Sequence, residues 1–293
     1  MKKMEGRIVQ GIGGFYYVKT EHGIVECRAR GKFRKDNITP LVGDVVEIQM
    51  VSDKEGYILN IAPRKNQLIR PPVANVDQAI IVFAITKPEL NRTLLDKMIV
   101  LSESNNIKPI ICINKIDLGE SDEYLKLVDL YRRIGYKAVA TSAVTKVGIE
   151  ELKSYLKDKT SFLAGPSGVG KSSIINSIQS NITLKTGELS EKLLRGRHTT
   201  RSVELISLDF GGFVLDTPGF TALTLDIEKE ELKYYFKEFL DLQRECKFSS
   251  CLHVNEPGCS IIKAVEDKVI DKNRYISYLA ILKELREKEK RRY

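Results

Sequence analysis

A glycine-rich segment at residues 165–172 has the residue types and spacing of a loop that binds phosphates. Its glycines allow backbone N–H groups to surround phosphate oxygens, Lys171 can reach the β- and γ-phosphates, and the Ser172 hydroxyl can bind Mg²⁺. An apolar run precedes the segment and a helical pattern follows it, which disfavours an accidental glycine-rich turn. The predicted nucleotide contacts in this loop are Gly165, Pro166, Ser167, Gly168, Val169, Gly170, Lys171, Ser172 and Ser173.

Two further segments, at residues 114–117 and 141–143, can distinguish guanine from adenine. Asp117 can accept hydrogen bonds from N1–H and the 2-amino group of guanine, whereas adenine would leave the carboxylate unpaired. The N–H of Ala143 can donate to guanine O6. A solvated helix start is the alternative for residues 114–117, but three motifs at three predicted strand ends favour GTP and GDP as ligands. The predicted base contacts are Asn114, Lys115, Ile116, Asp117, Ser142 and Ala143.

Two segments are predicted to sense the γ-phosphate. Asp216 ends a predicted strand and can hold Mg²⁺ through water, while the N–H of Gly219 can contact the phosphate. Residues 196–201 are predicted to form a first switch, in which Thr199 or Thr200 completes the magnesium shell in the GTP state. An ordinary basic loop is the alternative for residues 196–201.

The residue that orients the attacking water is the least obvious member of the predicted site. Phe220 follows Gly219, where Ras-like enzymes have a glutamine, and an apolar side chain cannot position water. The imidazole of His198 can do so once a partner orders the switch; contact of His198 with RNA or solvent is the alternative. The predicted catalytic residues are His198, Lys171, Thr199, Thr200, Asp216 and Gly219.

The order of these motifs indicates a circular permutation. The base-reading segments precede the phosphate loop, whereas a Ras-like chain begins with its phosphate loop. A sheet tolerates such a rearrangement because the original ends can be rejoined at the surface. The Asp216 segment therefore leads directly into the C-terminal part of the chain.

A compact cysteine and histidine cluster follows in the C-terminal part. Three thiolates and one imidazole within so few residues can close a tetrahedral structural zinc site, without an open position for catalysis. The other two of the five cysteines, Cys27 and Cys112, are isolated in apolar or strand-like contexts and are predicted to be buried and inert. The predicted zinc ligands are Cys246, Cys251, His253 and Cys259.

The pattern of elements predicts a multi-domain fold with an OB-type β-barrel at residues 1–65, a circularly permuted α/β P-loop GTPase domain at 66–225 and a small helical zinc-binding domain at 226–293. Five short strands broken by glycine turns indicate the barrel. Strands that alternate with helices then indicate an open, mostly parallel sheet. After about Asp226 strand signals stop, and the chain ends in a polar helix predicted at 275–286.

Charge and hydropathy restrict the partners. The formal net charge is +8, and residues 1–65 hold twelve Lys or Arg against eight Asp or Glu, which weakly favours a polyanion. Lys32, Arg34 and Lys35 are predicted on a turn beside Phe33, which fits RNA binding and a solvated loop about equally. The apolar runs are too short to span a bilayer and the N-terminus has no signal-peptide pattern, so we expect a cytoplasmic protein without a membrane partner.

Together the permuted order, the residues 196–200, the basic barrel and the cysteine–histidine cluster resemble the ribosome-small-subunit-dependent GTPase A family over nearly the whole chain. The resemblance implies a GTPase that acts late in small ribosomal subunit assembly, with GTP hydrolysis timing release and the two flanking domains binding rRNA. In the family, residues 114–117 and 165–173 are the GTP contacts and the cysteine–histidine cluster binds zinc. We also expect a monomer.

Three classes of function fit the motifs: a GTPase whose turnover is its purpose, an RNA-binding assembly chaperone with hydrolysis as a clock, and a permuted GTPase of the large subunit. The barrel and the zinc cluster count against the third, since they add two domains that can bind RNA.

Overall fold

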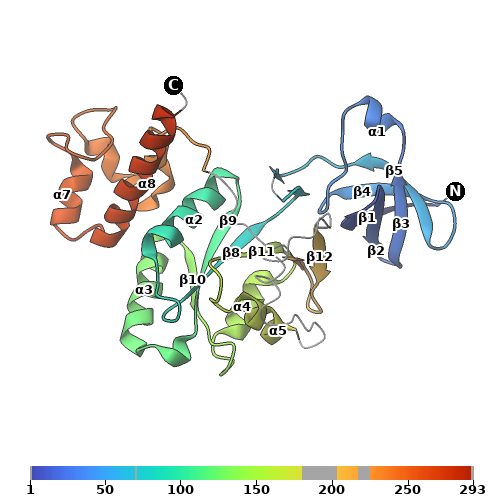
Figure 1. The fold of residues 1–293 in the computed structure, drawn as a ribbon, viewed down its shortest axis with the longest axis horizontal. Coiled ribbons are helices and arrows are strands. Elements are labelled where there is room, and N and C mark those ends of the chain that lie inside the picture. The colour runs from blue at the N-terminus through green and yellow to red at the C-terminus, as the bar shows by residue number, and fades with distance from the viewer. Residues whose placement is uncertain (1, 70, 180–202, 217–224, 292–293) are drawn as a thin grey trace.

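The computed structural model describes residues 2–69, 71–179, 203–216 and 225–291, with the backbone alone for Arg34, Lys35, Ser121 and Asp216. Figure 1 shows three bodies in a row: a β-barrel near the N-terminus, a central sheet flanked by helices, and a helical body near the C-terminus. This is the multi-domain fold that the sequence predicts, while the boundaries at residues 65 and 225 stay predictions. Within the described residues, no helix combines the length and apolar character needed to cross a membrane.

Five strands close the N-terminal barrel in the order β1-β2-β3-β5-β4, with β4 pairing back onto β1. Closure removes the free edges of the sheet, as in an OB-type barrel. Alternate side chains fill the interior, and Ile8, Val18, Ile48 and Ile58 are each 0% exposed. The strands are β1 (Lys3–Ile12), β2 (Phe15–Thr20), β3 (Gly23–Ala29), β4 (Val45–Met50) and β5 (Glu55–Ile61).

The basic segment after β3 differs from the prediction. It forms the one-turn helix α1 (Lys32–Lys35) where the sequence predicted a turn. The Phe33 ring is 5% exposed and belongs to the hydrophobic core, because burial of so large an apolar ring is favourable. A buried ring cannot stack on an RNA base, so Phe33 itself cannot contribute a stacking surface; whether the basic residues beside it bind RNA stays a prediction.

The central sheet has the strand order β10-β9-β8-β11-β13-β12. Its pairs are parallel, except that β12 runs antiparallel to β13. All residues of β8 are buried, as expected for a strand covered on both faces. The strands are β8 (Gln78–Ala84), β9 (Lys108–Asn114), β10 (Lys137–Ala140), β11 (Thr160–Ala164), β12 (Glu204–Ser207) and β13 (Phe213–Asp216), preceded by the short pair β6 (Gln67–Leu68) and β7 (Val73–Ala74).

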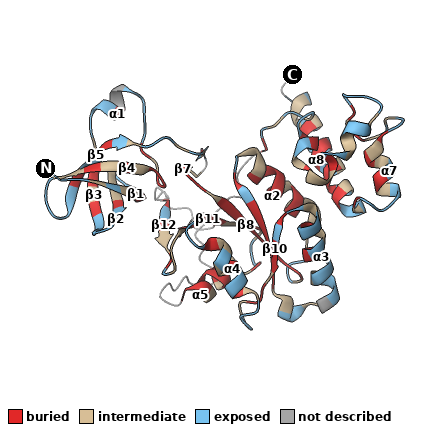
Figure 2. Ribbon diagram, turned by 180° about the vertical axis from the view of Figure 1, so that it is seen from behind, coloured by how far each residue is buried: buried red, intermediate tan, exposed pale blue. Residues whose placement is uncertain are grey.

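Helices cover both faces of this sheet, and buried strand residues line its centre (Figure 2). Ile81 and Phe83 of β8 join one core with residues of α2 and α3, whereas Ile80 and Val82 join a second core with residues of α4 and α5. The alternation follows from the two-residue period of a strand. Helix α4 was not predicted from the sequence. The helices are α2 (Arg92–Ser104), α3 (Ser121–Ile134), α4 (Ile149–Leu156) and α5 (Lys171–Ile178).

The C-terminal body contains short helical turns and two helices. Phe236, Phe239 and Tyr278 form its centre, with ring centroids 5.0–5.2 Å apart. The last helix was predicted as polar, but Tyr278, Ile281, Leu282 and Leu285 on it are buried, and it packs against α2. The elements are η3 (Leu232–Tyr235), η4 (Lys237–Phe239), η5 (Leu242–Glu245), α7 (Ser260–Glu266) and α8 (Lys272–Lys290).

A buried ion cluster joins this body to the central domain. Arg274 of α8 is 2% exposed and donates to Asp96 Oδ1 on α2 at 2.5 Å and to Glu238 Oε1 at 2.7 Å. Tyr131 of α3 donates to the same Asp96 oxygen at 2.6 Å. Both carboxylates depend on one guanidinium, because a charge buried without a partner is costly.

We expect Arg274→Leu to lower the free energy of unfolding by about 3–5 kcal/mol, since it leaves two carboxylates without their cation. Lys97→Met is the matched control, because Lys97 of α2 forms an ion pair with Glu284 of α8 at the surface. Loss of that ion pair should lower the free energy of unfolding by about 1 kcal/mol or less. Chemical denaturation of both variants measures the difference. Equal losses would show that the buried cluster has no special role.

Candidate nucleotide site and metal centre

The predicted nucleotide motifs meet at one edge of the central sheet. Asn114 is the last residue of β9, Thr141 follows β10, Gly165 follows β11 and Asp216 ends β13. These strands are parallel, so their carboxyl ends lie at the same edge, where ligands bind in open α/β sheets.

Two positions of the phosphate loop accept only glycine. Gly165 has a φ of +137°, and a Cβ there would lie 2.0 Å from the carbonyl oxygen of Val82. Gly170 has a φ of +94°, and its Cβ would lie 2.4 Å from Asn114 Nδ2. Residues that carry a side chain rarely adopt these backbone angles, and neither position leaves room for a Cβ atom. The glycines therefore let the loop lie directly against β8 and β9.

Lys171 directs its ammonium group into the phosphate loop. Its Nζ donates to the carbonyl oxygens of Gly165 at 2.8 Å and Pro166 at 2.7 Å. Burial lowers the pKa of Lys171 below its ordinary value. Ser172, the next residue, is 9% exposed in the first turn of α5. A cation beside a helix N-terminus and a curled backbone can bind a phosphate.

Asn114 connects the phosphate loop with the two base-reading loops. Its side chain is buried; Nδ2 donates to the carbonyl oxygen of Val169 at 2.8 Å, and Oδ1 accepts from Thr141 Oγ1 at 3.1 Å. The N–H of Ile116 donates to the Thr141 carbonyl oxygen at 3.3 Å. The three loops thus have fixed relative positions.

The base-reading loops hold one carboxylate in place. Ser142 Oγ donates to Asp117 Oδ1 at 2.5 Å and accepts from the N–H of Thr145 at 3.0 Å. Ser177 of α5 donates to the carbonyl oxygen of Ala143 at 3.1 Å, which fixes the adjacent backbone. Asp117 itself is exposed and can accept from the N–H groups of a ligand.

The segment that follows β8 also borders the site, although it was not predicted from the sequence. Lys115 Nζ donates to the carbonyl oxygen of Lys87 at 2.5 Å, and Pro88 lies 3.8 Å from the position of a Cβ on Gly168. This segment borders both the base-reading loop and the phosphate loop. Its place directly after a parallel strand could have indicated it, because every such strand end lies at the ligand-binding edge.

Several predicted site residues lie outside the described residues: His198, Thr199, Thr200 and Gly219. Asp216 is described by its backbone alone, as the last residue of β13. Their roles stay predictions.

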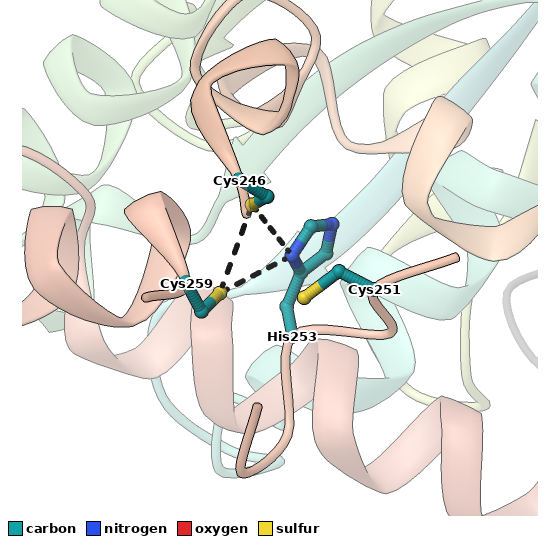
Figure 3. A group of neighbouring side chains, drawn as sticks. All are labelled: Cys246, Cys251, His253 and Cys259. Atoms are coloured by element: carbon teal, nitrogen blue, oxygen red, sulfur yellow. Dashed lines mark hydrogen bonds between the residues drawn. The ribbon is translucent and has the colours of Figure 1, made fainter. Parts of the chain in front are cut away.

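The predicted metal ligands do come together in the C-terminal body (Figure 3). The ligand atoms of Cys246, Cys251, His253 and Cys259 all lie within 4.8 Å of one another. His253 Nδ1 is 3.6 Å from the Cys246 sulfur and 3.3 Å from the Cys259 sulfur, and these two sulfurs are 4.0 Å apart. Tetrahedral zinc sites require about 3.6 Å between sulfur and nitrogen and about 3.8 Å between sulfurs. The cluster could therefore hold one metal ion.

The electrostatics of the cluster also suit a cation. Burial and the charge of Lys233 lower the pKa of His253 to about 4, so its imidazole is neutral, as a metal ligand must be. Burial raises the pKa of Cys251 to about 12 and also raises that of Cys259, so the thiolate forms of both side chains need a compensating positive charge. A bound metal ion could supply that charge.

Hydrogen bonds shape the loop that carries Cys251 and His253. The Glu256 carboxylate accepts from the N–H groups of Leu252, Val254 and Asn255 at 2.7–3.0 Å. Tyr275 and Tyr278 of α8 donate to the carbonyl oxygens of His253 and Leu252 at 2.7 and 2.8 Å. The loop is thus tied to α8, whose other contacts reach the central domain.

Comparison with known proteins agrees with this arrangement. A family model described as the RsgA GTPase matches residues 61–226, and one described as the RsgA N-terminal domain matches residues 5–58. The chain belongs to the RsgA GTPase family. The resemblance inferred from the motifs is therefore confirmed.

Curated members of the RsgA family match the chain along its whole length. One from Caldanaerobacter subterraneus subsp. tengcongensis, named small ribosomal subunit biogenesis GTPase RsgA, is 71% identical over 293 residues, which are 100% of this chain and 99% of the relative. One of the same name from a Geobacillus species is 50% identical and covers 98% of this chain and 99% of the relative.

Solved structures agree on the RsgA fold. YjeQ from Thermotoga maritima is 43% identical with a TM-score of 0.85, and covers 97% of this chain and 99% of its own. YloQ, described as a circularly permuted GTPase, is 41% identical with a TM-score of 0.82, and covers 98% of this chain and 96% of its own. The permuted order predicted from the motifs is thereby confirmed.

We expect removal of the metal to unfold mainly the residues after about 226, because this part has a small core of its own and metal binding contributes folding energy. Hydrogen exchange with and without a chelator should localise the loss. Cys251→Ser should lose the metal in mass spectrometry of gently purified protein, whereas Cys27→Ala, in the barrel core, should retain it. Protein that carries no metal and melts unchanged with chelator would contradict the site.

Proposed function

We propose that this chain hydrolyses GTP to GDP and phosphate at the carboxyl edge of the central sheet, and that the reaction serves late maturation of the small ribosomal subunit. The observation that carries the proposal is the Asn114 side chain, which holds the phosphate loop against the two base-reading loops. The names of the curated relatives supply the connection to the subunit.

The phosphate loop binds the triphosphate in this proposal. Lys171 leaves its two carbonyl partners for the β- and γ-phosphate oxygens, which are better partners for an ammonium group. Ser172 and either Thr199 or Thr200 would hold Mg²⁺, and Asp216 would act on it through water. Bound Mg²⁺ neutralises charge that develops on the phosphate oxygens.

Guanine recognition rests on Asp117 and Ala143. Asp117 accepts from guanine N1–H and the 2-amino group, and the Ala143 N–H donates to O6. Ser142 keeps the Asp117 carboxylate oriented through its 2.5 Å hydrogen bond. Adenine offers no such donors, so it leaves the carboxylate unpaired.

Hydrolysis requires a group that orients water, and we assign that role to His198. Phe220 stands after Gly219 and cannot supply a hydrogen bond. Gly219 contributes its N–H to the γ-phosphate, and the subunit orders the switch that carries His198. Turnover by the protein alone is then slow.

The two flanking parts bind rRNA in this proposal, and the chain acts as a cytoplasmic monomer. The barrel spans residues 1–65, the GTPase domain 66–225 and the zinc-binding domain 226–293. Zn²⁺ is the metal we assign to the cysteine–histidine cluster, because three thiolates and one imidazole favour it and leave no position for catalysis.

We expect small ribosomal subunits to raise the GTP turnover number, while large subunits at equal concentration do not. His198→Ala should retain GTP affinity and subunit binding, but its subunit-stimulated rate should fall about a hundredfold. A turnover number that subunits leave unchanged would contradict the proposed function. A variant that reaches the stimulated wild-type rate would exclude His198 and leave water orientation to the ribosome.

We expect Asp117→Asn to weaken GTP binding at least about tenfold and to improve binding of xanthine nucleotides, because an amide can donate to the xanthine 2-oxo group. Fluorescent nucleotide titrations measure both affinities. Asp129→Asn is the control, since Asp129 is an exposed acid on α3. An unchanged base preference in Asp117→Asn would remove Asp117 from the site.

A further inference from the structure

Within the part of the chain that the structure describes, the pairing of β1 with β12 joins the barrel to the central sheet. Gln10 of β1 pairs antiparallel with Glu204 of β12, which makes the barrel strands and the central strands one continuous sheet. The Gln10 side chain also donates to the Glu204 carboxylate at 3.3 Å. This junction was not evident from the sequence, since its residues lie far apart in the chain.

The junction leads directly to a proposed catalytic residue. Glu204 is paired with Gln10 on one side and with Asp216 of β13 on the other. Gln10, Glu204 and Asp216 thus form one row across the sheet, from the barrel to the aspartate that we propose acts on Mg²⁺ through water. In chain order, β12 and β13 also adjoin the two segments proposed as switches.

Two barrel cations strengthen the same junction. Lys19 of β2 donates to Ser207 Oγ of β12 at 2.7 Å, and its Nζ is 5.6 Å from the centre of the Phe213 ring on β13. Arg7 of β1 lies 5.5 Å from the centre of the same ring. A cation near an aromatic ring is attracted to it, so Phe213 holds β13 to the barrel.

Arg7 also links the barrel with β11, the strand that leads into the phosphate loop. Its Nη1 donates to the Gly43 carbonyl oxygen at 3.3 Å and to Thr160 Oγ1 at 3.2 Å. Burial lowers the pKa of Arg7, although Asp77 opposes that shift. The guanidinium is therefore partly enclosed at the junction, where a displacement of the barrel changes its contacts.

We propose that Arg7, Gln10 and Lys19 are positioning residues for hydrolysis: they set the place of β12 and β13, and hence of Asp216, according to how the barrel is held by its RNA partner. The inference rests on the proposed function. Coupling of this kind is reciprocal, so the bound nucleotide also changes the affinity of the barrel for RNA. Hydrolysis becomes fast when the barrel takes up the position that it adopts on the small subunit.

Lys19→Met tests the proposal, because it removes the ammonium and keeps an unbranched apolar chain. Its turnover number with saturating small subunits should fall by at least about fivefold, while the Michaelis constant for GTP, GDP affinity and subunit binding change less than about twofold. Lys19→Arg should restore much of the rate. Lys54→Met, at an exposed barrel lysine in the β4–β5 connection, should behave as wild type.

Ser207→Ala removes the acceptor on β12 and provides an independent variant. It should reproduce part of the effect of Lys19→Met, because it removes the Lys19–Ser207 hydrogen bond but leaves Lys19 beside the Phe213 ring. The double variant should be no worse than Lys19→Met alone, because that hydrogen bond is already lost in Lys19→Met. Additive losses, or a Lys19→Met that loses subunit binding but keeps its turnover number, would overturn the inference. If subunits stimulate the turnover number of Lys19→Met as fully as that of wild type, only this inference is refuted. If subunits do not stimulate the wild-type protein, the proposed function is refuted as well.

Discussion

The side chain of Asn114 is the contact on which the geometry of the nucleotide site depends. A buried amide must satisfy its donors and acceptor within the protein, and Asn114 does so by bonding to Val169 in the phosphate loop and to Thr141 beside the second base-reading loop. Gly170 lies so close to this amide that a Cβ would stand 2.4 Å away. This one residue thereby sets the distance between the phosphate loop and the loops that we propose read the base.

The C-terminal body is held by two buried polar clusters, which compensate for a small apolar core. The cysteine–histidine cluster closes the loop after η5, and Arg274 bridges Asp96 of the central domain and Glu238. Loss of a metal from the first cluster, or of the Arg274 side chain from the second, would leave ionisable groups buried without a partner. Either change is therefore expected to unfold the C-terminal body as a unit.

The circular permutation decides where the flanking bodies attach. The chain enters the central sheet at β8 and leaves it after β13, and both strands are neighbours of β11, which carries the phosphate loop. Beyond the sheet, Lys288 of α8 donates to the carbonyl oxygen of Leu225 at 2.8 Å, which ties the departing chain to the last helix. The barrel, through Glu204, and the C-terminal body, through Leu225, therefore contact the chain on either side of Asp216 in the sequence.

The sequence by itself determined the elements and motifs that depend on neighbouring residues: most strands and helices, the glycine-rich loop at residues 165–172 and the cysteine–histidine cluster that could hold a metal ion. Loop chemistry and strand period act over a few residues, so a local pattern reveals them. Only the tertiary structure decided the contacts between distant segments. Examples are the Ser142–Asp117 hydrogen bond, the inward turn of Phe33 and the row Gln10, Glu204 and Asp216. The physical reason is that packing and strand pairing join residues far apart in the chain, and no local pattern records which pairs will meet.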